Sequence, residues 1–201
     1  MSSTEPPESN VRGILLAAGY STRFGTNKLL QPLPEGSNGA GTPIAVSAAR
    51  RLVAAIPESV AVVRPRAQKL SQLLREAGCK TVVCRNAADG MGTSLAAGVR
   101  ATADAHGWVV ALADMPFIKP ETIARIARAL VEGAAIVAPA YRGERGHPVG
   151  FARRFGDDLS ALRGDEGARE ILKIHPDGVT LLEVDDPGVL SDIDTPGDLK
   201  P

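Results

Sequence analysis

Residues 13–19 have the sequence Gly-Ile-Leu-Leu-Ala-Ala-Gly, a short apolar run that leads directly into small residues. A run of this length without a polar residue is typical of a strand that is covered on both faces. Such strands occur in α/β proteins, in which helices cover both sides of a parallel sheet. The stretch therefore predicts a buried first strand followed by a tight, glycine-containing loop.

The same alternation of apolar runs and helical segments continues to residue 138. Further strands are predicted at residues 60–63, 81–84, 108–113 and 135–138. Most of the segments between them repeat apolar side chains at the i, i+3, i+4, i+7 spacing of a core-facing helix. Repeated strand–helix units of this length imply a mostly parallel sheet with helices on both faces. The predicted fold is a three-layer, Rossmann-like α/β domain over residues 11–201.

The pattern changes after Pro139. Residues 141–151 are rich in glycine and predict a hairpin, and two short helices and a strand near Val179–Val184 are expected to follow. A loop of low order is expected at Pro34–Gly41, where Gly, Ser, Asn and Pro gather. Residues 1–10 lack the basic start and the apolar centre of a signal peptide, and we expect them to form a disordered tail.

The composition argues against several classes of protein. Lys and Arg together number 23, as do Asp and Glu, so the formal net charge is zero. General nucleic-acid binding needs an excess of basic residues, and a membrane-spanning helix needs about 18 or more consecutive apolar residues. Cys79 and Cys84 are too few for a disulfide framework and match no zinc spacing, so we expect buried or incidental thiols. We expect a soluble, cytoplasmic protein without a nucleic-acid or membrane partner.

The loop after the first strand is the first candidate site. The small residues Ala17, Ala18 and Gly19 let the backbone come close to a ligand, and backbone N–H groups in such a turn can cradle an anion. Arg23 and Lys28 add two positive charges that can bind phosphate. The alternative is an ordinary glycine turn with two surface bases. Glycine-rich loops are common, and this one has neither the Walker spacing nor the Gly-x-Gly-x-x-Gly fingerprint.

Asp114 is the second candidate. It follows the predicted strand at residues 108–113, and open α/β sheets place their ligands at the carboxyl ends of such strands. Magnesium prefers one or two carboxylates together with phosphate oxygens and water, so Asp114 suits a Mg²⁺ anchor. The alternative is an Asp that merely starts a turn before Pro116.

Asp192 and Asp194 form the third candidate. If they lie at the end of a strand next to that of Asp114, one of them can complete the metal site. We expect only one of the two to face the metal. Asp194 is favoured because it directly precedes Thr195 and Pro196, which suit a helix start. A helix-start residue without a metal role is the competing interpretation.

Two further segments are candidates for substrate contacts. Gly90–Ser94 is predicted to be a second flexible loop, before a helix that begins near Leu95. Its Thr93 and Ser94 hydroxyls suit contact with a sugar or a base, although Ser94 suits a plain helix N-cap equally well. His147 lies in the predicted hairpin, without a Ser or Cys partner in a nucleophile context. We therefore expect it to be structural or a substrate contact, outside the chemical step.

Six segments of the chain resemble, in order, the molybdenum-cofactor nucleotidyltransferase family, and in particular the molybdenum cofactor cytidylyltransferases. They are Leu16–Gly19 with Arg23, Gly25 and Lys28; Gly90–Leu95; Ala113–Pro116; Arg145–Val149; Gly164–Arg169; and Asp192–Pro196. Each segment alone is a weak signal, but their order along nearly the whole chain is specific. The long insertion at Pro34–Gly41 departs from the family's usual pattern. This departure concerns the identity of the acceptor molecule more than the type of reaction.

The resemblance implies a GT-A-like nucleotidyltransferase fold in which Asp114 and Asp194 hold Mg²⁺. It implies that Arg23, Lys28 and Asp114 carry the catalysis. The implied nucleotide-binding residues are Leu16, Ala17, Ala18, Gly19, Arg23, Lys28, Asn86, Gly90, Gly92, Thr93 and Ser94. The implied contacts of the acceptor, a molybdopterin-type cofactor, are Met115, Pro116, Arg145, Gly146, His147 and Pro148.

The resemblance also indicates which base the bound nucleotide carries. Guanylyltransferase relatives carry Leu-Ala-Gly-Gly at the first loop, whereas cytidylyltransferases carry Ala-Ala-Gly, as this chain does at residues 17–19. The methyl group of Ala18 reduces the space for a purine, so CTP is the expected nucleotide. The implied reaction transfers CMP from CTP to molybdopterin and releases pyrophosphate, and a molybdenum hydroxylase is an expected recipient of the product. The alternatives are an enzyme that uses GTP or another phosphorylated acceptor, and a non-catalytic carrier of the cofactor.

Overall fold

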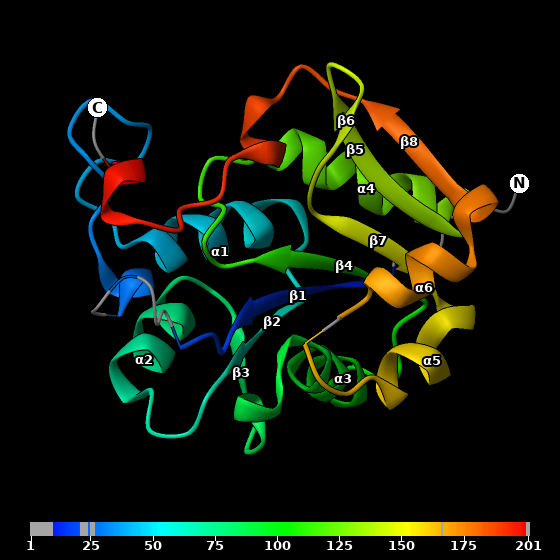
Figure 1. Cartoon of the computed structure of the whole chain (residues 1–201), viewed down its shortest axis with the longest axis horizontal. Coiled ribbons are helices and arrows are strands. Elements are labelled where there is room, and N and C mark those ends of the chain that lie inside the picture. The colour runs from blue at the N-terminus through cyan, green and yellow to red at the C-terminus, as the bar shows by residue number, and fades with distance from the viewer. Residues whose placement is uncertain (1–9, 21–23, 25–26, 166, 200–201) are drawn as a thin grey trace, which may run out of the picture.

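The computed structural model describes residues 10–20, 24, 27–165 and 167–199 of the 201-residue chain. Within these residues, eight strands form one sheet with helices on both faces (Figure 1). Arg23 and Gly25 lie outside the described residues, as does the expected tail apart from Asn10. None of the described helices is long and apolar enough to cross a bilayer.

The strands and α-helices alternate along the first two thirds of the chain. In order they are β1 (Val11–Ala17), α1 (Ile44–Ala55), β2 (Ser59–Val63), α2 (Gln68–Glu76), β3 (Lys80–Val83), α3 (Met91–Ala101), β4 (Gly107–Leu112), α4 (Pro120–Val131), β5 (Ile136–Tyr141), β6 (Glu144–Arg145), β7 (Val149–Ala152), α5 (Gly156–Ala161), α6 (Arg169–Ile174) and β8 (Val179–Glu183). Short 3₁₀ helices lie between or after these elements, including η1 (Lys28–Leu30), η2 (Ala87–Asp89), η5 (Pro187–Leu190) and η6 (Pro196–Leu199).

The sheet has the order β3-β2-β1-β4-β7-β5-β6, and β8 pairs with β5. β3, β2, β1 and β4 are parallel, as are β5 and β8, whereas β7 runs antiparallel between β4 and β5. The predicted α/β fold with a mostly parallel sheet is therefore confirmed. The antiparallel strands come from the segment after Pro139, where the sequence pattern changes.

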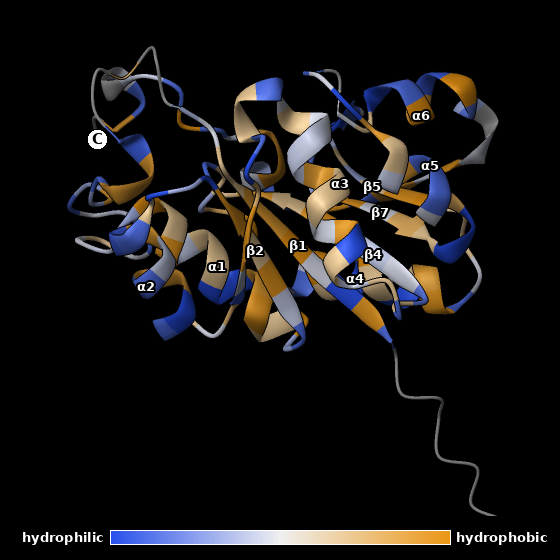
Figure 2. Ribbon diagram, turned by 90° about the horizontal axis from the view of Figure 1, so that it is seen from below, coloured by the Kyte–Doolittle hydropathy of each residue, from blue (hydrophilic) through white to orange (hydrophobic). Residues whose placement is uncertain are grey.

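Successive residues of the central strands enter two separate cores. Leu15 packs with residues of α1, α2 and α4, whereas its neighbour Ile14 packs with residues of α3, α5 and α6. Figure 2 shows bands of hydrophobic residues along β1 and β2, between helices that carry hydrophilic residues on their outer faces. Because both faces of the sheet are covered, the strands show no alternation of polar and apolar residues.

The segment at Pro34–Gly41 is not the loop of low order that we expected. The N–H of Leu33 donates to the carbonyl oxygen of Thr42, and the N–H of Gly41 donates to that of Leu33, both at 2.9 Å. Leu33 is 2 % exposed and belongs to a small apolar cluster with Ile193. The insertion is thus a hydrogen-bonded loop that is anchored beside the C-terminal segment.

Asp186 joins the last part of the chain to α4. Its carboxylate is 1 % exposed and accepts the N–H of Lys119 at 2.8 Å, the hydroxyl of Thr122 at 2.7 Å and the N–H of Gly188 at 3.1 Å. Asp186→Ala leaves these donors without a partner, so we expect the free energy of unfolding to fall by about 3 kcal/mol. Urea denaturation measures the loss. Asp185→Ala, at the exposed neighbour, is the control, and an equally small change in both variants would contradict this role.

Candidate active site

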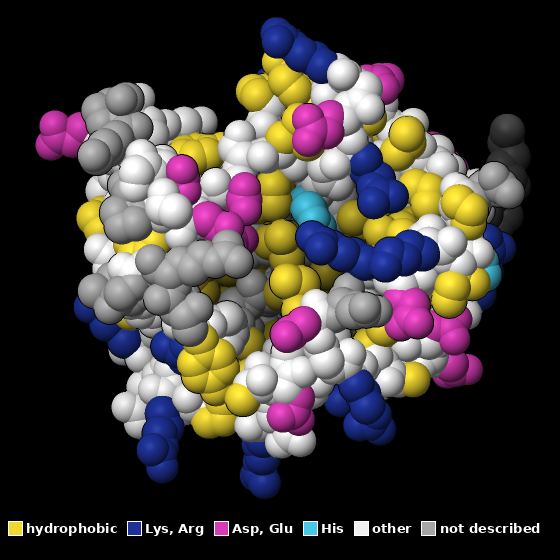
Figure 3. Space-filling view, viewed as in Figure 1, with side chains coloured by type: hydrophobic (Ala, Val, Ile, Leu, Met, Phe, Trp, Pro, Cys, Tyr) yellow, Lys and Arg dark blue, Asp and Glu magenta, His cyan; other side chains and the backbone are white. Residues whose placement is uncertain are grey.

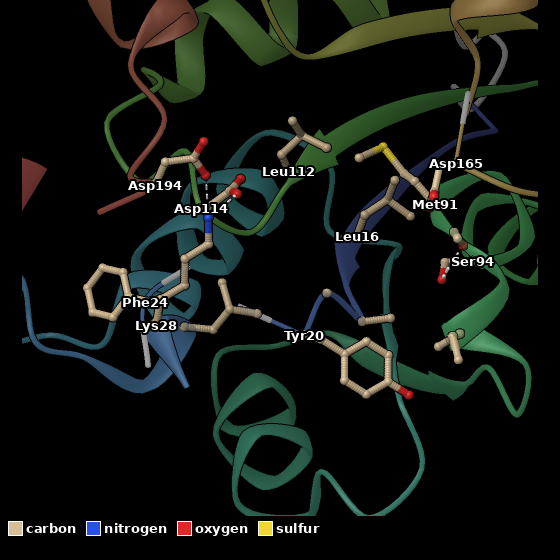
Figure 4. Close-up of a pocket in the computed structure, with 16 residues that line it drawn as sticks. Leu16, Tyr20, Phe24, Lys28, Met91, Ser94, Leu112, Asp114, Asp165 and Asp194 are labelled. Atoms are coloured by element: carbon tan, nitrogen blue, oxygen red, sulfur yellow. Dashed lines mark hydrogen bonds and ion pairs between the residues drawn. The ribbon is translucent and has the colours of Figure 1, made fainter. Parts of the chain in front are cut away.

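The candidate site lies where β1 and β4 end. The two strands are parallel neighbours, and Leu16 of β1 lies opposite Leu112 of β4. β2 and β3 lie on the other side of β1, so the strand order reverses between β1 and β4. Open α/β sheets bind ligands at the carboxyl ends of their strands at such a point. A pocket of about 450 Å³ opens at this edge of the sheet (Figure 4).

Most residues that are predicted to bind the nucleotide or the metal line this pocket. They are Leu16, Ala18, Gly19, Lys28, Gly90, Ser94, Asp114 and Asp194. Four other predicted nucleotide-binding residues do not line it: Ala17, Asn86, Gly92 and Thr93. Arg23 lies outside the described residues, so its contact with phosphate stays a prediction.

Lys28 joins the two predicted metal ligands. Its Nζ atom lies 2.9 Å from an oxygen of Asp114 and 2.9 Å from an oxygen of Asp194, and it donates to the carbonyl oxygen of Ile193 at 2.8 Å. Figure 4 shows the lysine reaching the two carboxylates at one end of the pocket. Each of the three ammonium protons therefore has an acceptor, and one positive charge faces two negative charges.

The backbone brings Asp194 to this position from the far end of the sequence. The N–H of Ile193 donates to the carbonyl oxygen of Asp114 at 3.0 Å, so the two segments lie side by side. The Ile193 side chain is 1 % exposed, which fixes the segment against the molecule. Asp194 lines the pocket, whereas Asp192 does not. Residues two positions apart share a face of a regular strand, so strand alternation does not account for this difference.

Burial and charge act in opposite directions on Lys28. Burial alone would lower the pKa of its ammonium group, because desolvation disfavours the charged form. Hydrogen bonds and charge attraction from Asp114 and Asp194 outweigh burial, so the pKa of Lys28 is raised above its ordinary value. The pocket therefore holds a stable cation between two carboxylates at neutral pH.

The same two carboxylates fit a divalent metal ion. Mg²⁺ is held in proteins by one or two carboxylates together with phosphate oxygens and waters. Oxygens of Asp114 and Asp194 already lie 2.9 Å from a single cationic atom, so their spacing suits a small cation. No candidate cluster of three or more His, Cys, Asp or Glu side chains exists among the described residues. A metal here would therefore need further oxygen ligands, such as those of a bound triphosphate.

The structure corrects the interpretation of Gly90–Ser94 as a flexible loop. α3 begins at Met91, so Gly92, Thr93 and Ser94 belong to its first turns, and only Gly90 precedes the helix. Gly90 has a φ of 120°, a backbone conformation that favours glycine. The helix starts four residues earlier than the predicted Leu95 because the glycine, and not the Thr-Ser pair, ends the preceding segment.

Gly90 and Gly92 make room for another part of the chain. A Cβ atom on Gly90 would lie 2.3 Å from the carbonyl carbon of Gly164, and one on Gly92 would lie 2.8 Å from the carbonyl oxygen of Arg163. The N–H of Gly92 also donates to the carbonyl oxygen of Gly164 at 2.8 Å. The close approach that these glycines permit is therefore to residues 163–165.

The pocket also contains residues that the sequence does not predict as site residues. They are Tyr20, Phe24, Leu29, Ala87, Ala88, Met91, Leu112 and Asp165. Most of them are apolar or aromatic and form walls, but Asp165 is charged. It lies at the end of the pocket opposite Asp114 and Asp194 (Figure 4). The one available sequence signal for Asp165 is its place in Gly164–Arg169, one of the six family-like segments.

The residues that are predicted to bind the acceptor lie outside the lining of this pocket. Met115 is 4 % exposed within the core, and Pro116 and Pro148 are also buried. Gly146 packs so closely on the chain that a Cβ atom there would lie 2.3 Å from the carbonyl oxygen of Val189. Figure 3 shows the hollow on this face, with acidic side chains on one side of a histidine and basic side chains on the other.

His147 is half-buried among charged groups. Its Nδ1 atom is buried and has no hydrogen-bond partner within the described part of the chain. Burial lowers the pKa of His147 below its ordinary value; Asp114 and Asp192 oppose this shift, whereas Arg169 and Arg145 add to it. The imidazole is therefore neutral near pH 7.

The lowered pKa of His147 predicts that acid reduces stability. The unfolded chain takes up a proton at His147 near pH 6.5, whereas the folded chain takes it up only at lower pH. Below about pH 6.5 the unfolded state thus binds more protons, and the free energy of unfolding falls as the pH falls. His147→Asn should flatten this slope between about pH 7.5 and 5.5, as measured by urea unfolding. Identical slopes in both proteins would contradict the shift.

Comparisons with known proteins find relatives that match nearly the whole chain. The chain is 31% identical to the purine catabolism protein PucB of Bacillus subtilis over 195 residues, which cover 92% of this chain and 91% of PucB. It is 30% identical to the nicotine blue oxidoreductase of Paenarthrobacter nicotinovorans over 194 residues, which cover 92% of each chain.

Solved structures share the fold. A nucleotidyl transferase from Methanothermobacter, Mth528, superposes with a TM-score of 0.76 at 25% identity, covering 94% of this chain and 93% of that chain. The Rv0371c protein of Mycobacterium tuberculosis, solved in complex with manganese, gives a TM-score of 0.72 at 24% identity, covering 94% and 95%. The model of the MobA-like NTP transferase domain matches residues 13–180. The chain therefore belongs to the family of MobA-like NTP transferase domains and is a nucleotidyltransferase.

Proposed function

We propose that this nucleotidyltransferase transfers CMP from CTP to the phosphate of molybdopterin, forming the cytosine dinucleotide of the cofactor and pyrophosphate. The observation that carries the proposal is the cluster of Lys28, Asp114 and Asp194 at one end of the pocket. The cluster combines a phosphate-binding cation with two carboxylates that suit a metal. An enzyme that cleaves a triphosphate needs both, whereas a carrier of the cofactor needs neither.

The proposed reaction is an in-line displacement at the α-phosphorus of CTP. An oxygen of the acceptor phosphate forms a bond to the α-phosphorus, and the bond from that phosphorus to the bridging oxygen breaks. The electron pair of the broken bond leaves with pyrophosphate. A phosphate monoester is already ionised near neutral pH, so the reaction needs no strong general base. Catalysis then depends on positioning and on charge neutralisation.

Lys28 supplies positive charge to the triphosphate in this scheme. Its ammonium group carries three donors on a flexible stem, so it can exchange a carboxylate oxygen for a phosphate oxygen without leaving the pocket. We assign Arg23 the same task, on the basis of its place in the first family-like segment.

Mg²⁺ is the proposed metal, and Asp114 and Asp194 would hold it. When bound, it neutralises charge on the phosphate oxygens of the nucleotide. The manganese complex of Rv0371c, which has the same fold, supports a divalent metal, since both ions prefer oxygen ligands.

Ala18 supports CTP as the nucleotide. Ala18 is among the residues that line the pocket, and its methyl group is proposed to take space that a purine would need. A Cβ atom added to the neighbouring Gly19 would meet nothing within 4 Å, which leaves open space for a ligand against the backbone. Gly90 and Ser94 line the same pocket and are the proposed contacts of the nucleoside.

The acceptor is proposed to lie beside His147 and Arg145. His147 is close enough to Asp114 for the two to interact electrostatically, so this side of the hollow adjoins the metal cluster. A molybdenum hydroxylase is the proposed recipient of the product.

The release of pyrophosphate tests the function. Purified protein is mixed with Mg²⁺, molybdopterin and either CTP or GTP, and release is expected with CTP. Equal use of both nucleotides would contradict the role of Ala18. Release with another phosphorylated acceptor but not with molybdopterin would contradict the acceptor, and no release with any acceptor would favour a carrier.

A further inference from the structure

The position of Asp165 is determined by how its neighbours pack on the start of α3. The carbonyl oxygen of Gly164 accepts the N–H of Gly92 at 2.8 Å. The backbone of Gly164 fills the space beside Gly90, where a Cβ atom would lie 2.3 Å from its carbonyl carbon. The Oδ1 atom of Asp165 lies 2.5 Å from that same Cβ position. The exposed carboxylate thus lies beside Gly90.

A second contact holds the other end of this segment. A Cβ atom on Gly167 would lie 3.4 Å from the Sδ atom of Met91, which itself lines the pocket. Residues 164 and 167 therefore rest on three consecutive residues, 90–92. Asp165 lies next to one of these contacts and lines the pocket.

The carboxylate of Asp165 has no hydrogen bond or ion pair with the part of the chain that the structure describes. It lies at the end of the pocket opposite Lys28 and Asp114 (Figure 4). Because the phosphates are proposed to bind at the lysine end, Asp165 faces the nucleoside. A carboxylate only accepts hydrogen bonds, so its partner must present an N–H or O–H group.

The walls around this end of the pocket suit a flat base. Leu16, Ala87 and Met91 present apolar atoms there, and apolar surfaces favour the faces of a base over ribose hydroxyls. The proposed role of Ala18 limits the base to a pyrimidine. Cytosine and uracil differ at the ring position where cytosine has an amino group and uracil has a carbonyl oxygen. A carboxylate accepts from the amino group and repels the carbonyl oxygen.

We infer that Asp165 accepts a hydrogen bond from the exocyclic amino group of cytosine and thereby selects CTP over UTP. This inference rests on the proposed use of CTP. Two residues then divide the recognition of the base. Ala18 excludes purines by size, and Asp165 distinguishes the two pyrimidines by their hydrogen bonding.

Asp165→Asn tests the inference, because the carboxamide has the same shape but can both donate and accept. The affinities for CTP and UTP are measured by isothermal titration with Mg²⁺ and without an acceptor. We expect the ratio of the two affinities to fall by about 10- to 100-fold in this variant. Asp89→Asn, an exposed carboxylate in η2 that does not line the pocket, is the control for the change in net charge and should keep the wild-type ratio.

An unchanged ratio in Asp165→Asn would overturn the inference, even if both affinities fell together. Equal affinities for CTP and UTP in the wild type would overturn it as well. A variant that weakens CTP but not 2′-deoxy-CTP would assign Asp165 to the ribose and would also overturn it. These outcomes are distinct from a failure of the proposed function, which requires that the wild type release no pyrophosphate from CTP.

Discussion

Replacement of Asp114 by Asn is expected to lower kcat/KM for pyrophosphate release by about 10³-fold. The carboxamide keeps the shape of the side chain but loses the charge that would hold Mg²⁺ on the phosphates. Lys28 keeps its contacts of 2.9 Å with Asp194 and 2.8 Å with the carbonyl oxygen of Ile193, so we expect the free energy of unfolding to change little. The loss should therefore appear in turnover and in metal affinity, not in stability.

Three measurements separate these effects. Initial rates give the loss of turnover, titration with Mn²⁺ in the presence of CTP gives the metal affinity, and urea unfolding gives the stability. Asp185→Asn makes the same chemical change at an exposed carboxylate outside the pocket and should leave all three unchanged. Near-wild-type activity of Asp114→Asn would show that the metal is anchored elsewhere.

The part of the site that the sequence predicts best is the proximity of Asp114 to the loop that follows β1. Both follow apolar runs that are buried on both faces, and parallel neighbours such as β1 and β4 end at the same edge of the sheet. Local pattern alone therefore brings Ala18, Gly19 and Asp114 together. The choice between Asp192 and Asp194 is not local in this sense, because residues two positions apart share a face of an extended backbone, yet only Asp194 lines the pocket.

The contacts that close the pocket could not be predicted in this way. Lys28 and Asp194 are 166 residues apart, and their contact depends on the backbone hydrogen bond from Ile193 to Asp114. The glycines at 90 and 92 are equally compatible with the approach of a ligand and with the approach of another segment. Only the packing of residues 163–165 decides between these possibilities, and no local spacing encodes that packing.

Replacement of Lys28 by Met is expected to have two opposite effects. Turnover should fall by about 10²-fold, because the triphosphate loses a cation that neutralises its charge. The carboxylates of Asp114 and Asp194 also lose a positive charge 2.9 Å away. Without that charge they should bind Mn²⁺ in the absence of nucleotide about tenfold more tightly than the wild type does.

Titration with Mn²⁺ alone measures the second effect, and Lys69→Met, at an exposed lysine of α2, is the control. If the lysine only supported the fold, its replacement would weaken metal binding. If it bound phosphate alone, its replacement would leave metal binding unchanged.

The geometry predicts an increase in metal affinity, because the ammonium already uses its three donors on Asp114, Asp194 and Ile193. To reach a phosphate it must release at least one of them, and a metal ion on the freed carboxylate compensates for that release. Metal and nucleotide should therefore each raise the affinity for the other in the wild type, and this coupling should weaken in Lys28→Met.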